Sequence, residues 1–110
     1  MPTPAEKVYI ALFDRRELSD SEGWLSKEGE KALHNALENM EWTHNGKPER
    51  NMAIFNMRFG FNNGCGMSLR DVGREFLISS ERVRQVEAKM LRRLRHPRHA
   101  LKSYLPPEGV

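Results

Sequence analysis

Hydrophobic positions recur every three or four residues along nearly the whole chain, and no segment alternates apolar and polar residues as a half-buried strand does. The pattern therefore predicts an all-α fold. A first helix is expected over about residues 5–18, a break at 19–23, and then a second helix capped by Ser26. The inward stripe of the second helix is Leu25, Ala32, Leu33, Ala36, Leu37 and Met40. Together these two elements would form an N-terminal helical hairpin.

Three more helices are predicted in the second half of the chain. After a turn at residues 45–48, one helix is expected over about 48–59, with Gly60 placed to end it in the left-handed conformation. Ser68 fits the start of a short helix, and Ser79 can cap a last, long helix. That helix has to stop before Pro97, because the residue preceding a proline is disfavoured in the helical region.

The short helix, the turn and the long helix have the order of a helix-turn-helix motif. Gly73 would let the two helices cross closely. Leu77 occupies a place where such turns often carry glycine, and a left-handed leucine would cost roughly 1–2 kcal/mol. Either the turn is longer and unstrained, or packing of Leu77 offsets the strain. The pattern alone also fits an ordinary helical hairpin.

The last helix is predicted to have two chemically different faces. Its buried face consists of Val83, Val86, Met90 and Leu94. Its opposite face presents Glu81, Gln85, Ala88 and Arg92, flanked by Arg84 and Lys89. Cations contact phosphates, while Arg, Gln and Glu also bond to base edges, so this face suits DNA.

The charge of the chain is divided unevenly between its two halves. The 110 residues allow one compact domain, or a small domain with an appendage. Residues 1–45 carry five basic and nine acidic side chains, a net −4, whereas residues 46–110 carry thirteen basic and six acidic ones, a net +7. We expect an acidic helical appendage over 1–45 and a basic domain over 46–110. The asymmetry fits a polyanionic partner, although a solvated cationic helix face would produce the same count.

No residue pattern points to catalysis, a metal or a membrane. Cys65 cannot form an internal disulfide alone, and together with His34, His96 and His99 it lacks zinc-ligand spacing. We expect no enzyme activity, no metal and no cofactor. No apolar run approaches the ~20 residues of a membrane span, and charges interrupt the apolar N-terminus, so neither a membrane segment nor a signal peptide is expected. These features predict a cytoplasmic protein.

Three stretches resemble region 4 of the sigma-70 family, and most closely that of the primary bacterial sigma factors. They are residues 57–60 (MRFG), 68–76 (SLRDVGREF) and 80–97 (SERVRQVEAKMLRRLRHP). The similarity extends over about residues 48–105. It implies a winged-helix-like region 4 bundle containing a helix-turn-helix, and an origin in a bacterium, phage or plasmid.

The resemblance also implies partners and roles. Region 4 inserts its second motif helix into the major groove of the promoter −35 element and docks on the β-flap of RNA polymerase. Glu81, Arg84 and Gln85 would then read bases. The residues expected at phosphates or at a neighbouring activator are Arg50, Arg58, Arg82, Lys89, Arg92 and Arg93. The expected flap-facing residues are Phe55, Phe59, Phe61, Ile78, Leu94 and Leu105.

The chain departs from the family in two places. Ser80 stands where the family usually has arginine, so weaker or altered −35 recognition is expected. Residues 1–45 do not resemble region 2, which melts the −10 element, and a separate region 2-type chain would have to supply that task. The N-terminal helices would then be a structural brace or a surface that binds a partner or dimerises.

Three functional hypotheses follow. The first is a standalone region 4-like transcription regulator, the second a helix-turn-helix regulator independent of polymerase, and the third an anti-sigma-like decoy. The similarity continues past His96 and Pro97, beyond what DNA reading requires, and this favours the first. The presence of Glu81, Arg84 and Gln85 argues against the decoy.

Overall fold

A computed structural model describes residues 1–40, 48–62 and 64–107, and every regular element in these residues is helical, as predicted. The α-helices are α1 (Pro4–Phe13), α2 (Lys27–Glu38), α3 (Pro48–Phe59), α4 (Leu69–Phe76) and α5 (Ser80–Leu94). Short 3-10 helices are η1 (Arg16–Asp20), η2 (Pro97–His99) and η3 (Leu101–Tyr104). Most of the turn predicted at 45–48 lies outside the described residues. Within the described part of the chain, no helix is long and apolar enough to cross a bilayer.

Four of the helices begin with the same local chemistry. The hydroxyls of Thr3, Ser26, Ser68 and Ser79 each accept a hydrogen bond from the backbone N–H three residues later. This satisfies one of the donors that a helix start leaves unpaired. The predicted caps at Ser26, Ser68 and Ser79 are therefore confirmed. At Thr3 the cap is reciprocal, because the Glu6 carboxylate also accepts from the Thr3 N–H at 2.9 Å.

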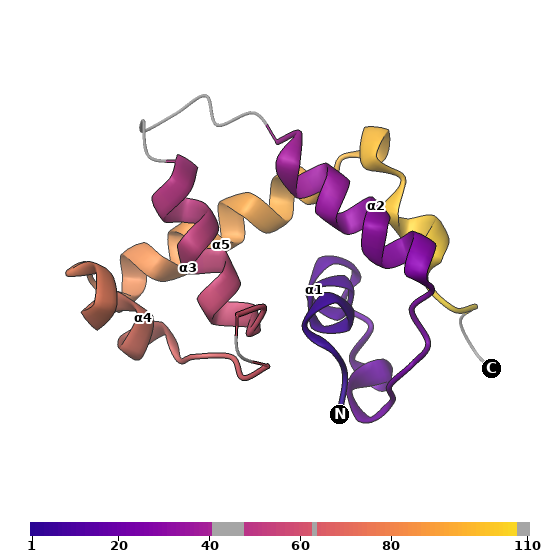
Figure 1. Cartoon of the computed structure of the whole chain (residues 1–110), viewed down its shortest axis with the longest axis horizontal. Helices are drawn as coiled ribbons and strands as arrows, with labels where there is room; N and C mark the ends of the chain where they lie inside the picture. Colours follow the sequence, from indigo (N-terminus) through magenta and orange to yellow (C-terminus); the bar gives the residue numbers. More distant parts are fainter. Residues whose placement is uncertain (41–47, 63, 108–110) are drawn as a thin grey trace.

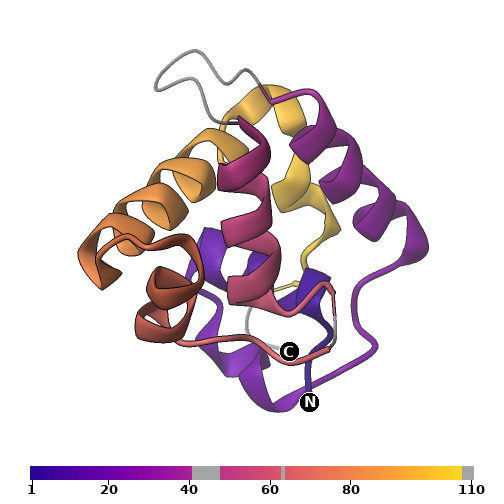
Figure 2. The same ribbon diagram turned by 60° about the vertical axis from the view of Figure 1, so that its left-hand side comes forward.

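Helix α5 runs behind α3, with α4 towards one side and α1 and α2 towards the other (Figure 1). Helices α3 and α4 pack against α5, while α2 packs against η3. Helix α1 lies between α3 and α2 and contacts α5, α3 and η3. The rotated view shows α3 in front, with α5 and α2 on either side of it (Figure 2).

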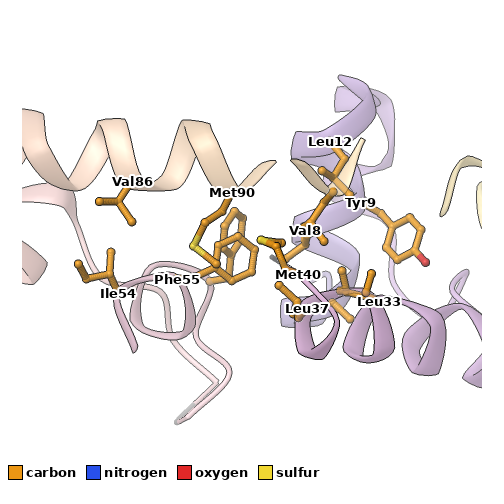
Figure 3. Close-up of a cluster of buried hydrophobic side chains, with 14 of the residues drawn as sticks. Val8, Tyr9, Leu12, Leu33, Leu37, Met40, Ile54, Phe55, Val86 and Met90 are labelled. Carbon is orange, nitrogen blue, oxygen red and sulfur yellow. The ribbon is translucent and has the colours of Figure 1, made fainter. Parts of the chain in front are cut away.

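Buried apolar side chains from all five α-helices form one cluster (Figure 3). Its members include Val8, Tyr9 and Leu12 of α1, Leu33 and Leu37 of α2, Ile54 and Phe55 of α3, Val72 of α4, and Val86 and Met90 of α5. Residues from both the acidic and the basic half of the sequence thus contribute to the same core.

The first helix differs from its prediction in length and in partners. It ends at Phe13 rather than near residue 18, because Asp14 adopts a left-handed conformation (φ 52°, ψ 45°) and the chain continues as η1. Its principal contacts are with α3, α5 and η3 rather than along α2. The Tyr9 hydroxyl does reach α2, where it donates to the Gly29 carbonyl at 2.7 Å. Burial raises the pKa of Tyr9, which keeps this donor protonated.

The helix-turn-helix is tight, and its turn is strained. A Cβ on Gly73 would lie 2.7 Å from the Ile78 carbonyl oxygen, which confirms that this crossing requires glycine. Leu77 is left-handed (φ 57°, ψ 42°) and 92% exposed. Neither sequence-based alternative for Leu77 is correct: the turn is short, and packing does not offset the strain.

We expect Leu77→Gly to raise the free energy of unfolding by up to about 1 kcal/mol, because it relieves left-handed strain of roughly 1–2 kcal/mol while adding some flexibility to the unfolded chain. Because the Leu77 side chain is exposed, its removal costs little packing energy. Urea unfolding measures the change. Leu77→Ala keeps a Cβ and serves as the control, with an expected change within about 0.5 kcal/mol. A loss of stability in Leu77→Gly would contradict the assignment of strain.

Candidate nucleic-acid interface

Helix α5 presents the expected base-reading side chains on its exposed face. Glu81, Arg84 and Gln85 are all exposed, and Ala88 and Arg92 continue the same face towards the C-terminus. On the other face, the predicted stripe of Val83, Val86, Met90 and Leu94 is buried. The prediction of the two faces is therefore confirmed. The fold directs the polar face of α5 to solvent because the apolar face anchors it in the core.

Two of the side chains that are expected to read bases, Glu81 and Arg84, pair with each other. Arg84 donates through Nε to Glu81 Oε2 at 2.9 Å and through Nη2 to Glu81 Oε1. The hydrogen bond from Arg84 holds the pKa of Glu81 below its usual range and so favours the ionised carboxylate. Arg82 donates more weakly to Gln85 Oε1 at 3.4 Å. The Arg84–Glu81 pair is exposed, so exchanging it for contacts to a ligand costs little.

A cationic groove of about 320 Å³ lies between α5 and the first turn of α3. Its lining is Asn51, Arg82, Arg84, Gln85, Val86, Ala88, Lys89, Met90, Arg92 and Arg93. Four of the six side chains expected at phosphates are in this lining, beside two of the three expected base readers. The structure therefore brings together most of the residues that the resemblance assigns to DNA.

Asn51 is a polar residue of this groove that the sequence reasoning missed. It is 9% exposed, and its Oδ1 has no hydrogen-bond partner among the residues that the structure describes. The same is true of Nε of the adjacent Arg50, which is half-buried. A signal for Asn51 was present in the sequence, because it lies three and four residues before Ile54 and Phe55 on the apolar stripe of α3. A polar residue on an otherwise buried stripe indicates a lining or a bonding role.

The Arg58 side chain, which was also expected to contact phosphate, instead forms hydrogen bonds within the domain. Its Nε and Nη2 donate to the two carboxylate oxygens of Glu87 at 3.2 and 3.3 Å, and its Nη1 donates to the Met67 carbonyl at 2.7 Å. The side chains of Arg58 and Glu87 are only 25% and 15% exposed. This bidentate pair joins α3, the segment before α4, and α5.

The apolar residues expected at the β-flap do not form one exposed surface. Phe55 and Leu94 are 0% exposed, and Phe59 is 7% exposed. Ile78, Phe61 and Leu105 are half-buried. In this conformation Phe55 and Leu94 have no surface with which to contact a partner directly.

The described histidines and the cysteine lie in different surroundings. Cys65 is exposed, and the rings of His34 and Phe61 pack in a T-shaped arrangement with their centroids 5.7 Å apart. Burial lowers the pKa of the half-buried His99, so its imidazole favours the neutral form. Among residues 1–40, 48–62 and 64–107, no three His, Cys, Asp or Glu side chains are grouped so that they could hold a metal ion.

A helix-turn-helix whose second helix presents exposed Glu, Arg and Gln side chains beside a cationic groove is typical of the DNA-binding class of this motif. Comparison with known proteins narrows that class. The family model for sigma-70, region 4, matches residues 48–96, which contain α3, α4 and α5. Residues 48–96 are therefore a sigma-70 region 4 domain.

The similar proteins include RNA polymerase sigma factors, and about half of this chain matches a small part of each. RNA polymerase sigma factor SigA of Clostridium acetobutylicum is 47% identical over 58 residues, which are 51% of this chain and 15% of that protein. The probable RNA polymerase sigma-C factor of Synechocystis is 51% identical over 49 residues, 44% of this chain and 12% of that protein. RNA polymerase sigma factor RpoD of Neisseria gonorrhoeae is 44% identical over 61 residues, 54% of this chain and 10% of that protein.

We expect Arg58→Ala to lower the free energy of unfolding by about 2 kcal/mol, because it leaves the largely buried Glu87 carboxylate without its bidentate donor. Denaturant unfolding measures the loss. Arg92→Ala is the matched control, since it removes an exposed guanidinium of α5, and its effect should stay within about 0.5 kcal/mol. Equal stability of Arg58→Ala and the unmutated protein would show that Arg58 is available for other contacts.

Proposed function

We propose that this protein is a transcription regulator that reads −35-like promoter DNA through α5 and docks on the β-flap of RNA polymerase. It acts with, or in place of, region 4 of another sigma factor. The observation that carries the proposal is the exposed set Glu81, Arg84 and Gln85 on the first two turns of α5, beside the cationic groove, within a sigma-70 region 4 domain.

The chemistry of α5 suits direct readout in the major groove. Arg84 can donate two hydrogen bonds to guanine O6 and N7, and Gln85 can pair with adenine N6 and N7. The ionised Glu81 carboxylate can accept from the cytosine amino group. When α5 enters the groove, the exposed Arg84–Glu81 pair would open and each partner would bond a base edge instead. A bidentate base contact is worth about 1–3 kcal/mol of discrimination, more than an exposed ion pair.

The cationic groove would hold the DNA backbone next to those bases. Arg82, Lys89 and Arg93 line it, and such contacts fix register and supply affinity independent of sequence. Ser80 adds no cation at the start of α5, so recognition of the −35 element is proposed to be weaker than in relatives with arginine there. Polymerase would supply the remaining affinity.

The proposed polymerase partner follows from the relatives, whose names describe them as RNA polymerase sigma factors. The match covers only 10–15% of those proteins, so tasks performed elsewhere in a sigma factor are not assigned to this chain. A separate region 2-type chain, or an activator contacting the exposed cations of α5, would complete promoter recognition.

One experiment tests both halves of the proposal. The full chain is incubated with core RNA polymerase and with a −35 duplex, each alone and then together, and binding is followed by co-purification and by fluorescence anisotropy. We expect binding to both, with tighter DNA binding when polymerase is present. Polymerase binding without DNA binding would instead identify an anti-sigma-like decoy. Binding to DNA together with a failure to bind polymerase would identify an ordinary helix-turn-helix regulator.

Substitutions on α5 should separate base reading from phosphate binding. We expect Gln85→Ala to reduce the preference for one base pair by about 1–3 kcal/mol, because it removes a base-edge contact. Lys89→Ala should weaken binding to all duplexes alike and reduce the slope of log K against log salt by about 0.9, the value of one lost phosphate contact. Affinities for a set of duplexes at several salt concentrations measure both effects. Identical behaviour of the two variants would show that the assignment of the α5 face is wrong.

A further inference from the structure

The cationic groove beside α5 has two chemically different walls. On α5, the half-buried cations Arg82, Lys89 and Arg93 line it together with the buried Val86. These four residues follow the spacing i, i+4, i+7, i+11, so they form one stripe along the helix. Among the described residues of the lining, Asn51 alone lies outside α5, in the first turn of α3. A neutral amide therefore lines the same space as a stripe of cations.

Asn51 is buried without the hydrogen bonds that would stabilise it there. The residue is 9% exposed, and its Oδ1 has no partner among the residues that the structure describes. A buried amide oxygen without a partner is destabilising. The surroundings are apolar, since Ile54 and Phe55 continue the buried stripe of α3 and Val86 points toward Ile54 (Figure 3). A leucine would suit the fold better at this position, so the amide points to a ligand in the groove.

Lys89 is the cation of the stripe that can use this amide. Arg82 already donates to Gln85 Oε1 at 3.4 Å, and Arg93 has an interaction of its own. Lys89 lies between these two along the stripe and has no hydrogen-bond or ion-pair partner among the described residues. A lysine ammonium is a point charge on a flexible stem, so a neighbouring acceptor is needed to hold it in one place. The unpartnered Oδ1 of Asn51 is such an acceptor.

The amide of Asn51 can bond to a lysine and to a phosphate at the same time. Its oxygen accepts hydrogen bonds, and its Nδ2 donates two. The Lys89 ammonium has three donors, so it can donate both to Oδ1 and to a phosphate oxygen. Nδ2 can donate to the same phosphate. This arrangement gives the buried Oδ1 of Asn51 the partner that it lacks in the unbound groove.

We propose that Asn51 is a positioning residue for DNA binding: its Oδ1 accepts from the Lys89 ammonium and holds it at a backbone phosphate, to which Nδ2 also donates. The inference rests on the proposed DNA binding and adds the residue that directs Lys89. It explains why an asparagine occupies a buried position of α3. Because a phosphate carries no sequence information, Asn51 contributes equally to the affinity for every duplex.

Asn51→Leu in the full chain tests this role by fluorescence anisotropy with a set of −35-like duplexes at several salt concentrations. We expect the Kd for every duplex to rise about tenfold, as for the loss of a hydrogen bond to a charged group. The slope of log K against log salt should fall by about 0.9, because Lys89 is no longer held at its phosphate. An unchanged Kd or an unchanged slope would overturn the inference.

Asn56→Leu is the matched control for this substitution. Asn56 is also an asparagine of α3, but it is half-buried and lines a separate cavity between α1, α2 and α3. We expect it to leave both the Kd and the salt slope unchanged. If Asn56→Leu caused the same losses as Asn51→Leu, the effect would belong to α3 in general, and the inference would be overturned.

Denaturant unfolding separates an effect on DNA binding from an effect on folding. Asn51→Leu should be as stable as the unmutated protein or more stable, because it removes a buried amide oxygen that has no partner. A loss of stability would assign Asn51 to the fold and overturn the inference. Asn51→Asp keeps the size of the side chain but pairs with Lys89 and repels phosphate, so its Kd should rise at least as much. Unchanged DNA binding by Asn51→Asp would also overturn the inference.

A double-mutant cycle tests whether Asn51 acts through Lys89. In the Lys89→Ala background, we expect the effect of Asn51→Leu on the Kd to shrink from about tenfold to about twofold. Its effect on the salt slope should disappear. Additive effects of the two substitutions would overturn the inference and leave the proposed function in place. Failure of the unmutated chain to bind any −35-like duplex would overturn both.

Discussion

The burial of one face of α5 is the constraint on which the rest of the structure depends. Val83, Val86, Met90 and Leu94 anchor this helix to the core, and α1, α3 and α4 all pack against it. Because the side chains on this face repeat at helical spacing, their burial fixes the rotation of α5 about its axis. The rotation in turn decides that Glu81, Arg84 and Gln85 face solvent. The position of these three exposed side chains is thus a consequence of core packing.

Features determined by neighbouring residues were predictable from the sequence. The caps at Ser26, Ser68 and Ser79 and the left-handed Gly60 (φ 81°) depend on contacts within a few residues. Features determined by distant parts of the chain were not. Arg95 reaches the Leu12 carbonyl across 83 residues of sequence, and Arg58 meets Glu87 across 29. A lone arginine in a sequence carries no sign of whether it will bond phosphate, a carboxylate or a helix end.

The expected flap residues illustrate a second limit of sequence reasoning. Periodicity shows that Phe55 and Leu94 belong to apolar faces, but it does not tell a core from an interface, since both exclude water in the same way. In this structure both side chains lie in the core. The burial of Phe55 depends on how the helices of the cluster pack together, which the pattern of α3 alone does not contain.

The hydroxyl caps at Thr3, Ser26, Ser68 and Ser79 have a consequence for how the protein responds to its ionic surroundings. They are neutral donors and acceptors, and the Arg58–Glu87 pair is largely shielded from solvent, so dissolved ions screen little of what stabilises the helices. The cations lining the groove beside α5 are open to those ions. The stability of the fold therefore depends little on salt concentration, whereas the affinity of the groove for a polyanion depends on it directly. A change in ionic strength can weaken the second while leaving the first nearly constant.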